Sequence, residues 1–152
     1  MPGHSRWRRA LLAPALGCCL GAPAPARAAD IRIVADGVPE PLTRSADPVR
    51  GRAVALSREA GCTLCHQLPA APGEPPPLGG DIGPPLAGTG SRWSVAQLRL
   101  RLIDSSRVNS GTVMPGYYRT EGLTRVAANL AGRTVLDAQQ VEDVVAWLSN
   151  LR

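Results

Sequence analysis

The feature that most constrains this chain is the stretch "GCTLCHQLP", residues 61–69. In it two cysteines are separated by two residues, and a histidine directly follows the second cysteine. Two thiols and one imidazole this close together cannot surround a metal ion alone, because structural metal sites draw ligands from a second, distant part of the chain. The stretch therefore needs either further ligands elsewhere or a cofactor that brings most of its own.

The first 28 residues have the pattern of a secretory signal peptide. Arginines make a positive start, an apolar run over 10–20 is too short to span a bilayer, and small residues follow in "APARAAD". We predict cleavage near Ala28 and export to the periplasm, with the Sec route expected. A twin-arginine signal at Arg8–Arg9 and a lipoprotein site at Cys18 are the alternatives.

Removing this segment simplifies both the charge and the chemistry of the chain. It takes four of the 17 basic residues and none of the 12 acidic ones, so the net charge falls from +5 to +1. No basic stripe remains, so we expect no nucleic-acid partner, and no further membrane span is expected. The remaining chain then has two cysteines, one histidine and one methionine, which are Cys62, Cys65, His66 and Met114.

C-x-x-C-H is the attachment signature of c-type haem. Each thiol of Cys62 and Cys65 forms a thioether with a vinyl group, and His66 then lies under the iron as proximal ligand. A thioredoxin-like pair would need strands around the motif, and a zinc site would need a second ligand pair. A plain disulfide would leave the adjacent histidine unexplained. We predict one covalent haem c.

Met114 is the candidate for the sixth iron ligand, because it is the only thioether left. Met/His ligation is typical of electron-transfer cytochromes c and raises the reduction potential. Pro115 stiffens the loop that carries it. The alternative is that Met114 is a core methionine and that the iron is open or otherwise ligated.

The chain divides into an extension at 29–47 and a domain at 48–152. We expect an all-α fold with irregular proline-rich loops. Ile31, Ile33 and Val34 suit a short extended segment, and the prolines that follow argue against a long helix. The extension suggests surface for a permanent partner, with a disordered tail as the alternative.

Four helices are predicted from apolar spacing and from capping residues. The second begins at Ser94 and the last at Asp137, each with a glutamine three residues on that completes a capping box. Gly61 is expected to end the first and Gly132 the third. The predicted ranges are Val49 to about Glu59, Val95 to Ile103, Leu123 to Leu130, and Ala138 to Leu151.

The stretch "GPPL" that follows the haem motif resembles class I cytochromes c. In that family a proline carbonyl accepts a hydrogen bond from the proximal histidine, and a leucine packs on the haem. The resemblance assigns these roles to Pro84 and Leu86. It also implies that the first and last helices cross near the haem, with Gly51 and Trp147 as candidates for the crossing.

The longer stretches "IGPPLAGTGSRWSVAQLR" and "TVMPGYYRTEGLTRV" resemble the SoxX family, and the likeness covers about residues 31–151. SoxX is the monohaem subunit of the SoxAX complex of sulfur-oxidising bacteria. The complex joins thiosulfate to a cysteine of the carrier protein SoxYZ as an L-cysteine S-thiosulfotransferase. Its catalytic haem belongs to SoxA, and SoxX passes electrons to a diffusible cytochrome c.

The resemblance therefore predicts an electron-transfer subunit that forms a heterodimer with a SoxA-type haem protein. We assign no catalytic residue to this chain, because its two remaining cysteines are used for haem. The main rival is a free periplasmic cytochrome c that carries electrons outside sulfur oxidation. A haem sensor or peroxidase-like enzyme is the other, and it would need an open sixth position where we place Met114.

Overall fold

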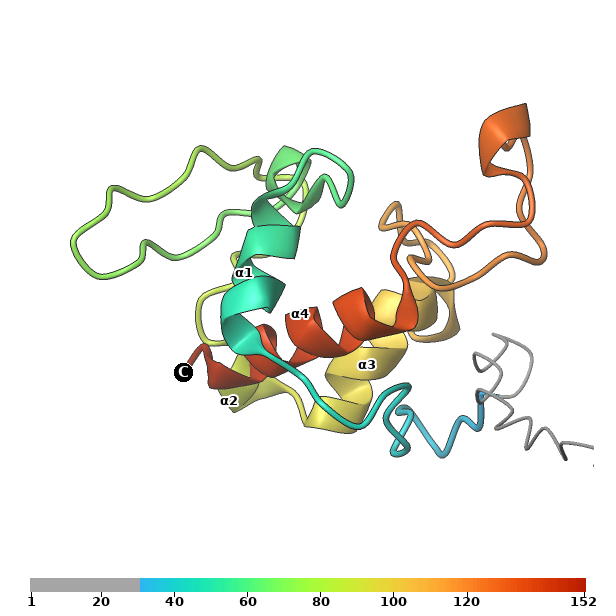
Figure 1. Ribbon diagram of the computed structural model, residues 1–152, viewed down its shortest axis with the longest axis horizontal. Helices are drawn as coiled ribbons and strands as arrows, with labels where there is room; N and C mark the ends of the chain where they lie inside the picture. The colour runs from blue at the N-terminus through green and yellow to red at the C-terminus, as the bar shows by residue number, and fades with distance from the viewer. Residues whose placement is uncertain (1–30) are drawn as a thin grey trace, which may run out of the picture.

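A computed structural model describes residues 31–152, and the predicted signal peptide lies outside them. This part of the chain is helical, with long irregular connections (Figure 1). Its only pairing of extended backbone is an isolated bridge between Val34 and Gly37, so the expected extended segment is no strand. The α-helices are α1 (Pro48–Leu56), α2 (Thr89–Arg92), α3 (Val95–Asp104) and α4 (Ala138–Asn150). Short 3-10 turns lie at Cys62–Leu64, Ser105–Arg107 and Ala128–Leu130.

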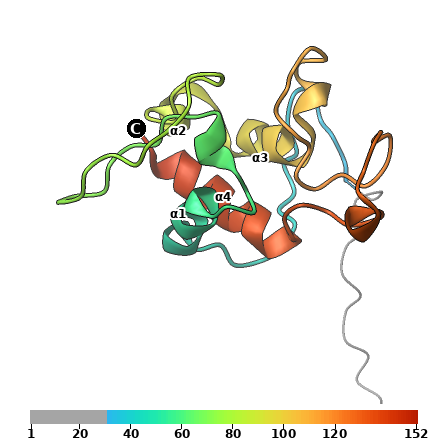
Figure 2. The same ribbon diagram turned by 90° about the horizontal axis from the view of Figure 1, so that it is seen from above.

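Helix α4 is the centre of the fold, because α1, α2 and α3 all pack against it (Figures 1 and 2). It begins as predicted at Asp137, where both halves of the capping box with Gln140 are formed. Apolar residues at helical spacing then give it a buried face. This face comprises Val141, Val144, Val145 and Leu148.

Helix α1 crosses α4 at Gly51, which is the crossing that the class I resemblance implies. A Cβ at Gly51 would meet the carbonyl oxygen of Asp143 and lie 2.9 Å from the backbone nitrogen of Val144. Only glycine lets the two helices approach this closely. Trp147 lies further along α4 and lines an apolar groove together with residues of α1.

Helix α1 is shorter than predicted and begins one residue earlier. The Asp47 carboxylate caps it by accepting from the backbone nitrogens of Val49 and Arg50, and Pro48 occupies the first turn, where a missing N–H costs nothing. The helix ends at Leu56 because Ser57 adopts extended backbone. Gly61 therefore does not end α1; with φ of 61° it begins the next turn instead.

Helix α3 begins at the predicted capping box. The Ser94 hydroxyl accepts from the backbone nitrogen of Gln97, and the Gln97 side chain accepts from that of Ser94. One side of the helix is buried and carries Leu98, Leu102 and Ile103. None of the helices in residues 31–152 combines the length and the apolar character that crossing a bilayer would need.

The prediction of a helix over Leu123–Leu130 is wrong. Only the 3-10 turn Ala128–Leu130 forms, within a connection that projects from the body of the molecule (Figure 1). Arg125 has a φ of 58°, which is outside the helical range. The apolar residues of this segment are exposed, and so short a helix is not stable without a surface to pack on.

The extension from 31 to 47 is not a free tail. Val38 is buried, and its backbone nitrogen donates to the carbonyl oxygen of Ala96 at 2.9 Å. Arg99 of α3 donates at 2.6 Å to the Val38 carbonyl and makes a bidentate ion pair with Glu142 of α4 at 2.7 and 3.0 Å. Glu142 also accepts from the backbone nitrogen of Leu42. A buried ion pair thus holds the extension against α3 and α4.

Candidate functional site

The two cysteines and the histidine of the motif lie on one tight turn. Gly61 adopts the left-handed backbone conformation that glycine favours, and the chain then turns through Cys62–Leu64. The Cys62 carbonyl accepts from the backbone nitrogen of His66 at 2.9 Å, which closes the turn. Both cysteines are free thiols, Cys62 buried and Cys65 partly so. Burial raises the pKa of the Cys62 thiol.

The chain returns from the proline-rich loop to pack its backbone against this turn. Three backbone hydrogen bonds join the two segments: Gly80 to Thr63 at 2.9 Å, Gly83 to Cys65 at 2.8 Å and Leu86 to Gln67 at 2.9 Å. A Cβ at Gly79 would lie 2.8 Å from Cα of Gln67, and one at Gly80 would lie 2.9 Å from the carbonyl carbon of Leu64. Glycine is therefore required at both positions.

The His66 ring is fixed from two sides. Its Nδ1 lies 2.7 Å from the carbonyl oxygen of Pro84, which is the arrangement that the class I resemblance implies. A carbonyl can only accept, so Nδ1 carries a proton, and in the neutral imidazole Nε2 is then the nitrogen with the lone pair. A Cβ at Gly83 would lie 2.6 Å from Nδ1 and 2.9 Å from Nε2. The ring thus occupies space that only glycine leaves open.

Arg92 of α2 secures the segment that supplies the Pro84 carbonyl. Its guanidinium donates at 2.9 Å to the carbonyl oxygen of Pro85 and at 2.7 Å to that of Ala87. Leu86, between these two, is partly buried against the core. The sequence does not indicate this role of Arg92, because the contact depends on where α2 lies relative to the loop.

Met114 lies in the irregular segment after α3 and is partly buried against the core. Hydroxyl groups hold its backbone on both sides. Ser105, which is buried at the end of α3, donates to the Met114 carbonyl oxygen at 2.7 Å. The Thr112 hydroxyl accepts from the Met114 backbone nitrogen at 3.1 Å. Neither contact was expected from the sequence.

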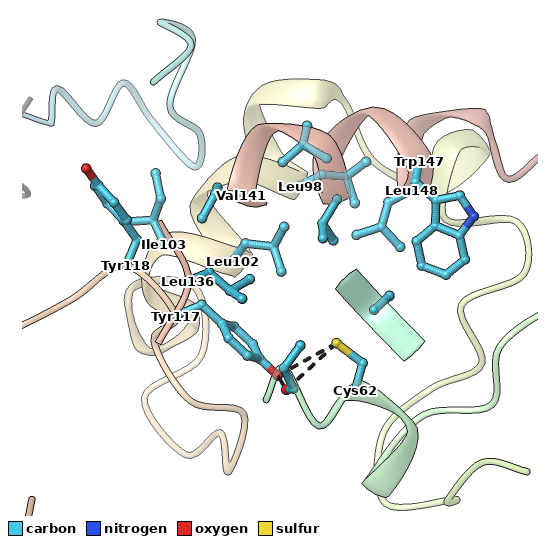
Figure 3. Close-up of a cluster of buried hydrophobic side chains, with 14 of the residues drawn as sticks. Cys62, Leu98, Leu102, Ile103, Tyr117, Tyr118, Leu136, Val141, Trp147 and Leu148 are labelled. Atoms are coloured by element: carbon cyan, nitrogen blue, oxygen red, sulfur yellow. Dashed lines mark hydrogen bonds between the residues drawn. The ribbon is translucent and has the colours of Figure 1, made fainter. Parts of the chain in front are cut away.

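Tyr117 connects the Met114 segment to the cysteine turn (Figure 3). Its side chain is buried, and its hydroxyl donates to the carbonyl oxygen of Ala60 at 2.9 Å. The Tyr117 hydroxyl oxygen also lies 3.9 Å from Sγ of Cys62. Burial raises the pKa of Tyr117, so the phenol stays protonated at neutral pH. In the sequence, the stretch "VMPGYY" carries the family resemblance but gives no sign of a role for this tyrosine.

The donor groups fit a haem that is attached through thioethers. The turn offers two free thiols and one imidazole nitrogen with an available lone pair, and Met114 offers a thioether sulfur. These are the groups that c-type haem attachment and Met/His ligation use. Across residues 31–152, no three or more His, Cys, Asp or Glu side chains cluster in a way that would hold a metal ion.

Comparison with protein families decides the class. Residues 50–152 match the family Cytochrome c. The chain belongs to the cytochrome c family. The cofactor of this family is a covalently bound haem c, and the all-α architecture agrees with the class I fold predicted from the sequence.

Comparison with solved structures also confirms the SoxX resemblance. The chain is similar to one in the crystal structure of SoxXA from P. pantotrophus, with a TM-score of 0.73 and 33% sequence identity. The likeness covers 83% of this chain and 97% of that one. A comparison with curated proteins gave no significant match.

Proposed function

We propose that this chain holds one haem c through Cys62 and Cys65, with His66 and Met114 as axial ligands of the iron. The haem supplies a one-electron redox centre. Pro84 orients the His66 imidazole through its carbonyl, and Leu86 gives the cofactor an apolar contact. The support is the geometry of the turn, where two free thiols and a fixed imidazole come from one short stretch.

The assignment of the haem has a direct test. The mature protein should begin near Ala29 and keep one haem through acid-acetone extraction, as measured by intact mass. Cys62→Ser with Cys65→Ser should abolish the covalent attachment. Retention of zinc in place of haem, or loss of the haem to the solvent, would contradict the assignment.

The proposed activity is electron acceptance in a complex of the SoxAX type. In the proposed reaction, a cysteine thiol of a SoxYZ-type carrier joins the outer sulfur of thiosulfate. One sulfur–sulfur bond forms, one proton is released, and two electrons pass to haem centres and then to a diffusible cytochrome c. This is the L-cysteine S-thiosulfotransferase reaction, and its catalytic site is expected on the SoxA-type partner.

The composition of this chain favours the accepting role over the catalytic one. Its only cysteines after residue 30 are the two that we assign to the haem, so no thiol remains to carry sulfur. Ligation by both His66 and Met114 would leave no open iron position for a substrate. The observation that carries the proposal is the 33% identity to a chain of a SoxXA structure over 97% of that chain.

Reconstitution tests the proposed function. The purified chain alone should be redox-active but unable to conjugate thiosulfate, and addition of a SoxA-type subunit and a SoxYZ-type carrier should give thiosulfate-dependent haem reduction. The chain should also co-purify with a SoxA-type protein from native periplasm, to which the predicted signal peptide would direct it. Elution as a monomer that exchanges electrons with a respiratory complex would favour the free-carrier alternative.

A further inference from the structure

Tyr117 is placed to connect two segments that are far apart in the sequence. Its hydroxyl donates to Ala60, 57 residues away, immediately before the turn that carries both cysteines. Met114 precedes it by only three residues. In Figure 3 the phenol ring extends from the core to Cys62, whereas the ring of Tyr118 points away from it.

The backbone of Tyr117 is itself fixed. Its nitrogen donates to the Leu102 carbonyl of α3 at 2.9 Å, and its own carbonyl accepts from the Leu136 nitrogen at 3.0 Å. The side chain is only 4% exposed, so the ring cannot move without disturbing the core. The hydroxyl is therefore held at a set position relative to α3.

The partner of the hydroxyl is also buried. Ala60 is 5% exposed, so its carbonyl has little access to water. A Cys62 sulfur in a thioether would carry no proton. Of Cys62 and Tyr117, only the tyrosine hydroxyl could then donate to the Ala60 carbonyl oxygen. Loss of the hydroxyl would leave a buried acceptor unsatisfied, which favours movement of one segment away from the other.

We propose that Tyr117 is a positioning residue for Met114. Its hydroxyl joins the Met114 segment to the start of the cysteine turn, and it sets the separation between the segments that supply the two axial ligands. This inference rests on the proposed function, since it requires the haem at Cys62 and Cys65 and the thioether of Met114 on the iron.

The test compares Tyr117→Phe with two controls in the haem-loaded protein. Tyr118→Phe removes the same atom from the next residue, whose pKa is raised by burial and by the Asp137 carboxylate. Leu136 is 1% exposed, so Leu136→Val loosens the core beside Tyr117. This variant keeps the tyrosine hydroxyl. The readouts are the rate at which imidazole displaces the sixth ligand, the methionine-to-ferric-iron charge-transfer band, and the reduction potential.

Tyr117→Phe should bind imidazole about five- to tenfold faster than the wild type, the factor that corresponds to loss of one hydrogen bond. Its charge-transfer band should weaken and its potential should fall. Tyr118→Phe should leave all three readouts near their wild-type values, and Leu136→Val should lower the melting temperature without an equal gain in imidazole rate.

Three results would overturn the inference, and they are distinguishable. A wild-type protein without the methionine band would refute the ligand assignment, and the inference with it. A wild-type protein with the band, together with a Tyr117→Phe variant that matches it in imidazole rate and potential, would refute the role of Tyr117 alone. If Leu136→Val changes the readouts as much as Tyr117→Phe does, and the two variants are equally stable, Tyr117 contributes only to general packing.

Discussion

The His66 segment and the Met114 segment are both irregular, but different contacts hold them in place. Around His66 the chain packs backbone against backbone, through Gly80 and Gly83 and their hydrogen bonds to residues 63 and 65. These backbone partners lie within the motif itself, and Arg92 of α2 holds the returning segment from outside it. The His66 side therefore tolerates no added side chain at its glycines.

Around Met114 the contacts come from single side chains. Ser105 and Thr112 hold the backbone of Met114, and Arg119 donates to both carboxylate oxygens of Asp104 at 3.1 Å. Each of these contacts can be removed by one substitution without a steric clash. The comparison indicates that the His66 segment, the proximal side, is rigid. The position of the Met114 segment, the distal side, can be changed in small steps by single substitutions.

The largest effect is expected from Gly83→Ala on the His66 side. The new Cβ would occupy space that the imidazole fills, so the ring must move away from Pro84 and from its proposed place as an iron ligand. We expect the haem mass to be retained, because the cysteines are unchanged, and the optical spectrum to change to that of an iron without its histidine.

Gly111→Ala is the matched control on the Met114 side, because a Cβ there would come no nearer than 3.6 Å to Oδ1 of Asn109. This variant should keep the wild-type spectrum. A Gly83→Ala protein with an unchanged spectrum would show that the ring adjusts easily, and the description of a rigid proximal side would be wrong.

The next effect in size is expected from Met114→Ala. It should open the sixth position, admit cyanide or carbon monoxide, and lower the reduction potential, since Met/His ligation raises it. Met114→His should keep six ligands at a lower potential. Optical titration and potentiometry measure these changes. If Met114→Ala matches the wild type in spectrum and potential, another group is the ligand.

The sequence predicted those features that depend on residues close together along the chain. Both capping boxes formed because the cap and its glutamine are three residues apart, so no tertiary packing is needed to bring them together. The crossing of the first and last helices at Gly51 was implied by the resemblance to class I cytochromes c. The resemblance implied the contact of Pro84 with His66, which composition and spacing could not supply.

The missed features depend on tertiary packing. Tyr117 reaches across 57 residues to Ala60, and no local pattern indicates its partner. Gly79 and Gly80 are adjacent in the sequence, but their tight approach to the motif follows from the path of the loop. The false helix over 123–130 shows the converse, because apolar spacing predicts a helix only where a core exists to receive its apolar face.

A third prediction concerns acid and the Met114 side. Burial alone would raise the pKa of Asp104, but hydrogen bonds from Ser106 and Arg119 outweigh it, and the pKa is lowered. Its stabilising contribution is therefore complete above its unfolded pKa of about 4 and is lost as pH falls below this towards the folded pKa.

The methionine charge-transfer band should accordingly weaken below about pH 4. Asp104→Asn should show a weaker band already at neutral pH and less further change in acid, as followed by optical titration. Asp81→Asn, at an exposed position on the proximal side, is the control. If the band has the same acid midpoint in the wild type and in Asp104→Asn, the ion pair of Asp104 does not help to hold Met114 in place.

The smallest effect is expected from Ser105→Ala, which removes the hydroxyl that donates to the Met114 carbonyl at 2.7 Å. A hydrogen bond of this kind contributes about 1 kcal/mol net, so the rate of imidazole binding should rise by about fivefold. Ser110→Ala, at an exposed position in the same segment, should leave the rate unchanged. The potential of Ser105→Ala should lie between those of the wild type and Met114→Ala. If Ser105→Ala and Ser110→Ala bind imidazole at the same rate, the Ser105 hydroxyl does not hold Met114, and the contrast with the His66 side loses this contact as support.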